Sequence, residues 1–390
     1  MTGRGRRREE REAEEHDGAV HPSLEYALVG CMAMIGAYLF TPVARQFAVR
    51  WGAVAKPRDR DVHATDTPRL GGTAILVGFA VAMIIAHALP TLRSTFANGT
   101  EINGVLWGGL IICLLGVLDD RYELDSLTKF AGQILAAAVM SIVGGIQLLT
   151  IYVPWSHANI TLDRDAGVEV TILLTVLTIN AINFIDGLDG LAAGVTAIQG
   201  VAFFAYSYHL ATTGNSDIAA APTLISAGLV GACLGFLLHN FAPARIFMGD
   251  SGSMLVGLML SAAATTAVTK VDPQSLGRAG ALPLYLPLVL PLAVLALPFG
   301  DLVLAVIRRL RRGQSPFAPD KEHLHHRLMD LGHSHRRAVL LLYFWSAVLA
   351  FGAVAMALTN GPWLVVTVVA ALLLAGLLFT AIPRLRSARV

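Results

Sequence analysis

The stretch Asn183-Phe-Ile-Asp-Gly-Leu-Asp-Gly190 places two carboxylates, Asp186 and Asp189, between glycines directly after an apolar run. Acids at or near a membrane span are costly, so by default they indicate a functional site. If the run is helical, Asn180, three residues before Asn183, shares this part of the surface. The glycines permit a tight turn and a close approach to phosphate. An ordinary polar turn between two helices is the alternative.

The composition around this stretch is that of an integral membrane protein. Of the 390 residues, 55% are hydrophobic and only 14% are charged, and the mean hydropathy is +0.62, values outside the usual soluble range. The net charge of +2 and the absence of a basic patch with interleaved aromatics argue against a nucleic-acid partner. The three cysteines lie in apolar runs and are interpreted as small buried hydrophobes.

Apolar segments of about 20 residues, the length that a bilayer core requires, recur along the chain. Eleven are predicted, near 25–45, 70–90, 104–120, 129–148, 168–184, 190–210, 219–239, 252–270, 283–307, 338–358 and 362–382. The fold class is therefore all-α, with about eleven transmembrane helices. One membrane domain, 25–383, is predicted between a charged, disordered tail at 1–24 and a short basic tail at 384–390, with a long loop at 308–337.

The distribution of Lys and Arg predicts the orientation. The connections that this topology places on one side, together with the C-terminal tail, hold 20 of the 29 basic residues, and the opposite connections hold four. Basic loops stay in the cytoplasm, so the C-terminus is expected inside and the N-terminus outside. The five arginines of the N-terminal tail oppose this orientation, but acids accompany them and the loops outnumber them.

The chemically capable residues gather on the basic side. Asp119 and Asp120 end one span, and Lys129 begins the next. Adjacent acids here could cap the helix that follows. They also suit a divalent cation or a proton acceptor beside phosphate.

The connection at 240–251 contains Asn240, Phe247 and Asp250, the last within Gly-Asp-Ser-Gly. A flexible helix cap is the simple interpretation. The functional one is an acid on Mg²⁺, glycines that admit a substrate, and a phenyl ring on which a base stacks.

The loop at 308–337 combines arginines, among them Arg309, with His323, His325 and His326. Zinc binding is disfavoured because no Cys or acid lies at ligand spacing and the three imidazoles would not converge on a helix. A solvated basic loop is one alternative. Anion binding fits best, since both residue types donate hydrogen bonds to phosphate and sugar hydroxyls.

Together these stretches resemble the polyprenyl-phosphate N-acetylhexosamine-1-phosphate transferases, which start bacterial glycan synthesis on a lipid carrier. The resemblance covers most of the chain and rests on five motifs in order: Pro68-Arg-Leu-Gly-Gly72, Asp119-Asp120, Asn183–Gly190, Phe247-Met-Gly-Asp-Ser-Gly252 and Asp320-Lys-Glu-His-Leu-His-His326. The His-x-His-His pattern is similar to that of members using UDP-N-acetylglucosamine. The muramoyl-pentapeptide branch usually has three consecutive histidines and has Pro-Thr-Met where this chain has Pro68-Arg-Leu.

The resemblance implies transfer of N-acetylglucosamine 1-phosphate from UDP-N-acetylglucosamine to a polyprenyl phosphate, with release of UMP, at the cytoplasmic face of a bacterial plasma membrane. Mg²⁺, with Mn²⁺ as an alternative, is the implied cofactor, and Asp250 and Asp119 are its expected ligands. The other expected catalytic acids are Asp120, which shares with Asp119 the expected role of base toward the lipid phosphate, and Asp186 and Asp189.

The expected substrate-binding residues are Lys129 for phosphate, Asn183, Asn240 and Phe247 for the nucleotide, and Arg309, His323, His325 and His326 for the sugar and its phosphates. The expected partners are the two substrates, membrane lipids and a second copy in a homodimer. The alternatives are a muramoyl-pentapeptide or another N-acetylhexosamine as the transferred group. A secondary transporter is a remote alternative, because the acids cluster at span ends and not at the bilayer midplane.

Overall fold

Helices dominate the computed structural model, which describes residues 22–55, 66–153, 158–213, 216–269, 295–313, 324–359 and 362–387. In chain order they are α2 (Pro22–Trp51), α3 (Gly71–Ala88), α4 (Arg93–Asn98), α5 (Glu101–Tyr122), α6 (Ser126–Gly144), α7 (Arg164–Ile185), α8 (Leu191–Thr212), α9 (Ser216–Asn240), α10 (Gly249–Thr269), α12 (Ala296–Arg311), α13 (Leu324–Asp330), α14 (His335–Leu358) and α15 (Pro362–Ser387).

Nine helices of the described residues are long and apolar enough to cross a membrane: α2, α3, α5 to α9, α14 and α15. Each overlaps a predicted span, and α10 overlaps another. A mostly helical, multi-pass membrane protein is thereby confirmed. The predicted span 283–307 is described from residue 295 on, where it coincides with α12. The predicted N-terminal tail lies largely outside the described residues, whereas residues 384–387 of the predicted C-terminal tail belong to α15. The count of eleven and the orientation stay predictions.

The central helix of the bundle is α10, which contacts α3, α5, α7, α8 and α9. Its residues from Met254 to Ala264 are all buried. Close approach depends on glycine, because a Cβ at Gly116 of α5 would lie 2.3 Å from Ser251 Cα. Small residues permit such packing between helices in a membrane, where apolar area alone drives no association.

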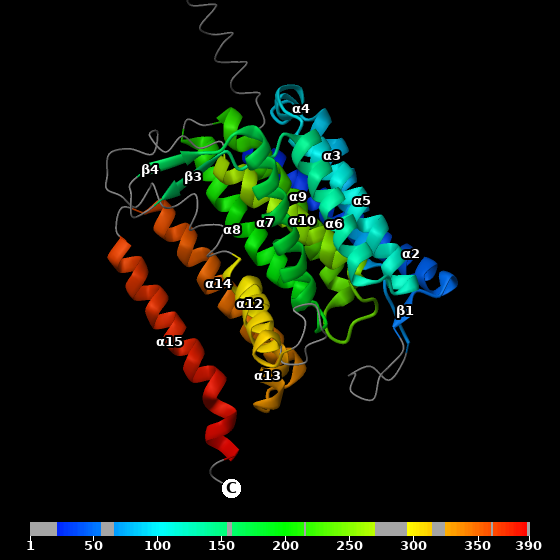
Figure 1. Ribbon diagram of the computed structural model, residues 1–390, viewed down its shortest axis with the longest axis vertical. Helices are drawn as coiled ribbons and strands as arrows, with labels where there is room; N and C mark the ends of the chain where they lie inside the picture. The colour runs from blue at the N-terminus through cyan, green and yellow to red at the C-terminus, as the bar shows by residue number, and fades with distance from the viewer. Residues whose placement is uncertain are drawn as a thin grey trace, which may run out of the picture.

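The outermost helix contrasts with α10. Figure 1 shows α15 at the edge of the bundle, and it packs against α14. Trp363 is 82% exposed and Leu364 is 72% exposed, which is the burial expected of a helix that faces lipid tails.

Two small antiparallel pairs of strands were not predicted: β1 (Val54–Ala55) with β2 (Thr67–Pro68), and β3 (Thr150–Val153) with β4 (Ala158–Thr161). The β-branched residues Thr150, Ile151 and Val153 favour a strand, but these runs are short and lie between long apolar spans. The hairpin β3–β4 joins α6 to α7 and lies at the end of the bundle opposite α13 (Figure 1).

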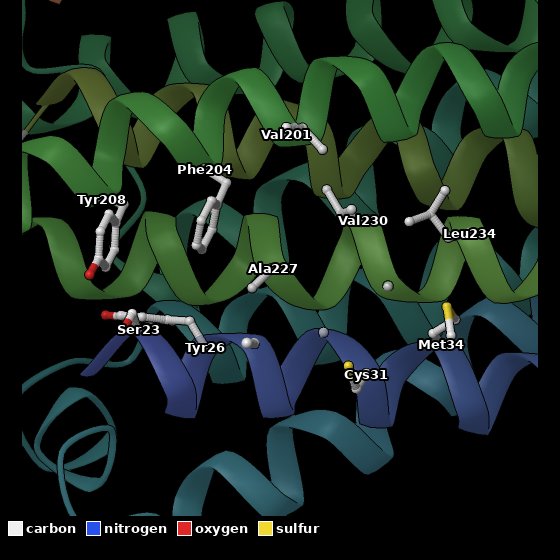
Figure 2. Close-up of a pocket in the computed structure, with 13 residues that line it drawn as sticks. Ser23, Tyr26, Cys31, Met34, Val201, Phe204, Tyr208, Ala227, Val230 and Leu234 are labelled. Carbon is white, nitrogen blue, oxygen red and sulfur yellow. The ribbon is translucent and has the colours of Figure 1, made fainter. Parts of the chain in front are cut away.

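An apolar pocket of about 430 Å³ lies between α2, α8 and α9. Figure 2 shows Val201, Phe204, Val230 and other apolar side chains along it, with the hydroxyl group of Tyr208 toward one end. It contains no carboxylate, Lys or Arg. The pocket therefore lacks the charged side chains that a reaction of phosphates requires, and the acids lie instead at the helix ends.

Candidate active site

Four helix ends bring charged and amide side chains together at the end of the bundle away from β3–β4. Asp119 lies near the end of α5, Lys129 in the first turn of α6, Asn183 near the end of α7 and Asp250 at the start of α10. The packing of α10 against α5 and α7 unites these residues. The sequence separates them by up to 131 positions.

Lys129 and Asp250 are the centre of this cluster. The Lys129 Nζ atom lies 2.5 Å from Asp119 Oδ2 and 2.8 Å from Asp250 Oδ2. The Asn183 Nδ2 atom donates to the other oxygen, Asp250 Oδ1, at 3.0 Å, and to Ser253 Oγ at 2.8 Å. Both oxygens of Asp250 are thus held by side chains that could exchange partners with a ligand.

Asp120 has different partners from its neighbour. Its two oxygens accept hydrogen bonds from the backbone N–H groups of Asp250 at 2.9 Å and Ser251 at 3.1 Å. These N–H groups belong to the first turn of α10, which has no intrahelical acceptors for them. Gly249 has φ +69°, and a Cβ there would lie 2.4 Å from Asp120 Oδ2. Asp120 therefore caps α10 and sets the position of Asp250.

A third acid, Asp125, caps α6, the helix that directly follows α5 in the chain. The Asp125 carboxylate accepts from the N–H groups of Leu127 and Thr128, both at 3.0 Å. Asp119 Oδ1 accepts from the Leu124 N–H at 2.8 Å. The simple interpretation of Asp119-Asp120 as a cap for α6 is therefore wrong, because Asp125 has that role.

Asp186 directly follows the last residue of α7, and the pKa of its carboxyl group is raised. Burial, followed by the negative charges of Asp250 and Asp120, raises the pKa of the Asp186 carboxyl to about 8, and the Arg69 guanidinium opposes this rise. The carboxyl group therefore shares the electrostatic environment of the cluster, where a cation or a proton stabilises it.

Arg69 is a residue of this site that we did not predict. It lies in the segment Pro68–Gly72, whose backbone is bonded to the loop before α10: the Phe247 N–H donates to Pro68 O at 2.8 Å, and the Gly71 N–H donates to Phe247 O at 3.1 Å. Among the described residues no carboxylate is within 4.0 Å of its guanidinium, and it is half-buried. The motif Pro68–Gly72 was the sequence signal that could have identified Arg69.

Asp189 and Asn240 both form hydrogen bonds to backbone groups of neighbouring segments. Asp189 Oδ2 accepts from the Ala244 N–H at 2.9 Å. Asn240 Oδ1 accepts from the Gly190 N–H at 3.0 Å, and Asn240 Nδ2 donates to Ile246 O at 2.9 Å. The two side chains thus tie the 186–190 turn to the 241–248 loop, which carries Phe247. Their predicted roles toward substrate stay predictions.

A second polar layer lies one helical turn below the cluster. Asn180 Nδ2 donates to Gln133 Oε1 at 2.7 Å, and Gln133 Nε2 donates to Met254 Sδ at 3.5 Å. These residues belong to the same three helices as Asn183, Lys129 and Asp250. Asn180 therefore braces α7 against α6, and it does not point to the carboxylates as the three-residue spacing suggested.

Three of the remaining predicted residues, Arg309, His325 and His326, lie on α12 and α13. The Arg309 guanidinium lies 5.2 Å from the ring centre of Phe184, next to Asn183 in the chain. His325 and His326 belong to α13, and His323 lies outside the described residues.

The donor set fits a hard divalent cation. Within the described residues no three His, Cys, Asp or Glu side chains form a ready metal cluster. Mg²⁺, however, is typically bound by one or two carboxylates together with water and substrate phosphates. Asp119 and Asp250 converge on one point, at present held by the Lys129 ammonium group, and so supply those two carboxylates.

Comparison with known proteins identifies the family of the chain. Residues 102–268 match the family model of glycosyl transferase family 4. A decaprenyl-phosphate N-acetylglucosaminephosphotransferase of Mycolicibacterium smegmatis is 46% identical over 95% of this chain and 91% of its own length. A probable undecaprenyl-phosphate N-acetylglucosaminyl 1-phosphate transferase of Bacillus subtilis is 34% identical over 83% of each chain. The corresponding transferase of Haemophilus influenzae is 32% identical over 82% of this chain and 83% of its own length. The chain therefore belongs to the polyprenyl-phosphate N-acetylhexosamine-1-phosphate transferases, as its motifs predict.

Proposed function

We propose that the protein transfers N-acetylglucosamine 1-phosphate from UDP-N-acetylglucosamine to a polyprenyl phosphate, giving polyprenyl-diphospho-N-acetylglucosamine and UMP. The observation that supports this most is the convergence of Asp119, Lys129, Asn183 and Asp250 from four helix ends. The names of the relatives support the acceptor and the transferred sugar.

The reaction joins two anions. An oxygen of the lipid phosphate attacks the β-phosphorus of the sugar nucleotide, and the bond to the α-phosphate oxygen breaks as UMP leaves with the electron pair. Catalysis therefore depends on positioning and on charge neutralisation. Lys129 and Arg69 are proposed to serve this purpose, and Arg309 is a further cation beside the described site.

The proposed cofactor is Mg²⁺, with Mn²⁺ as an alternative, held by Asp250 and Asp119 once Lys129 turns toward phosphate. When bound, the ion neutralises charge on the diphosphate and on the leaving group. Asp120 keeps Asp250 in place through the first turn of α10. This leaves Asp119 as the better placed of the two adjacent acids to orient or deprotonate the lipid phosphate.

The nucleotide is proposed to lie along the 241–248 loop, with Phe247 as its stacking surface and Asn183 beside the diphosphate. The segment with His323, His325 and His326 is proposed to contact the sugar, with Arg309 near its phosphates. The prenyl chain stays in the bilayer, which explains why the site lies at helix ends.

We also propose eleven spans, an outside N-terminus, and a cytoplasmic active site in a bacterial plasma membrane. The excess of Lys and Arg in the connections on the side of the site supports this orientation.

Purified protein with UDP-N-acetylglucosamine, polyprenyl phosphate and Mg²⁺ should release UMP. A panel that adds UDP-N-acetylgalactosamine and the UDP-muramoyl-pentapeptide tests the sugar. No UMP from any donor, in lipid nanodiscs as in detergent, would refute the transferase. Release from only the muramoyl donor would refute the sugar assignment.

A further inference from the structure

The start of α14 is bonded to the turn that carries two of the site acids. The His335 Nε2 atom accepts a hydrogen bond from the Asp189 backbone N–H at 3.1 Å. The Tyr343 hydroxyl, two helical turns further on, donates to Gly190 O at 2.5 Å. Both contacts connect residues about 150 positions apart, so only the tertiary fold creates them.

A third contact reaches the neighbouring loop. The Arg336 Nη2 atom donates to Ala242 O at 2.9 Å. Because Asp189 and Asn240 already tie the turn to this loop, α14 holds both segments at once. The loop continues through Phe247 directly into Asp250 and α10.

The same helix adjoins the segment with the histidines. Residues 331–334 separate the end of α13 from the start of α14, and Figure 1 shows α13 at the end of the bundle that carries the site. The beginning of α14 thus lies in the chain next to α13 and in space next to the 186–190 turn.

We propose that His335 and Tyr343 are positioning residues of the transferase: they hold the 186–190 turn, and through it the 241–248 loop, in the arrangement that the reaction needs. The kinetic part of this inference depends on the proposed function, and the structural part does not. Neither residue belongs to the motifs by which the sequence was assigned to its family.

The geometry of the hydrogen bonds of His335 and Tyr343 determines which substitutions test the proposal. Nε2 of His335 is an acceptor here, so it carries no proton. In His335→Gln the side-chain oxygen can accept from the same N–H, whereas His335→Ala leaves that N–H without its partner. Tyr343→Phe removes one hydroxyl and keeps the ring. The matched controls are His209→Ala and Tyr208→Phe, which alter the same residue types at the far end of α8.

The structural measurement is amide hydrogen exchange of the full-length protein in nanodiscs. In His335→Ala and Tyr343→Phe, peptides over 186–190 and 240–248 should exchange about tenfold faster, the effect of losing one hydrogen bond to a partly buried group. His335→Gln and both controls should match the wild type. Unchanged exchange in these peptides, or faster exchange along all of α8 and α14, would refute local positioning.

The kinetic measurement is UMP release. His335→Ala should lower kcat/KM about tenfold, and His335→Gln should restore it to within about threefold. Equal losses in the Gln and Ala variants would reject the hydrogen bond as the cause. A wild-type protein that releases no UMP would refute the proposed function, and the exchange comparison would still decide the positioning role.

Discussion

The two sides of the polar cluster differ in the groups that donate hydrogen bonds to their carboxylates. On the side of Lys129, Asp119 and Asp250 share a side-chain ammonium group, and Asn183 donates to Asp250. On the other side, Asp120 and Asp189 accept from backbone N–H groups. Side-chain partners can rotate away when substrate binds, but backbone partners belong to the fold. The first side is therefore suited to chemistry, and the second to holding the first in place.

The largest expected effect follows removal of divalent cations. With EDTA in excess, UMP release should fall to the background rate, because the diphosphate then keeps its full charge beside five acids of the site. Adding back Mg²⁺ should restore the rate. The measurement is the rate of UMP release as a function of free Mg²⁺ concentration. A rate that is insensitive to EDTA would exclude a divalent cation from the mechanism.

Asp250→Asn is expected to lower kcat by about 10³-fold, the range for removing one preorganised charge interaction. Thermal stability should be unchanged, since the first turn of α10 keeps its cap on Asp120. A melting curve in detergent accompanies the kinetics. Full activity would exclude Asp250 from the mechanism.

Asp120→Asn should reduce kcat by about 10²-fold through misplacement of Asp250, and should also cost about 2 kcal/mol of stability. The loss of stability separates this variant from Asp250→Asn. The control is Asp125→Asn, which weakens the cap of α6 at an exposed position and should leave kcat within about threefold. Stability equal to the wild type in Asp120→Asn would contradict its role as a cap.

Gln133→Leu should lower kcat only about threefold, the typical value of one polar contact between membrane helices. Asn180→Leu removes the same contact together with the bond to Val176 O, so the double variant should show less than additive losses. Strict additivity would show that the two residues do not act together.

The smallest effect is expected in the apolar pocket. Ala227→Leu partly fills a space whose lining contains no charged residue, so kcat should stay within about twofold of the wild type. A large loss of activity, without a loss of stability, would show that the pocket is energetically coupled to the polar cluster.

The sequence predicted the helical membrane fold, ten of the helical segments and the family. It also predicted that Asp119, Lys129, Asn183 and Asp250 belong to one site, which the structure brings together. It did not predict His335 or Tyr343 as parts of the surroundings, because neither belongs to a motif and their partners lie 146 and 153 positions away. It contained Arg69 only as part of the motif Pro68–Gly72. The strands β3 and β4 were missed because four-residue runs are weak signals between long apolar segments.

The sequence and the tertiary structure determine different properties of the protein for a physical reason. Apolar segments long enough for a bilayer, and acids at their ends, are local properties of the chain, so the sequence by itself determined the fold class, the residue types of the site and the family. Which of two adjacent acids faces a cation and which caps a helix depends on the rotation and depth of α10 between α5 and α7. Only the tertiary structure decided that, through close contacts at glycines such as Gly116, and it thereby separated the roles of Asp119 and Asp120.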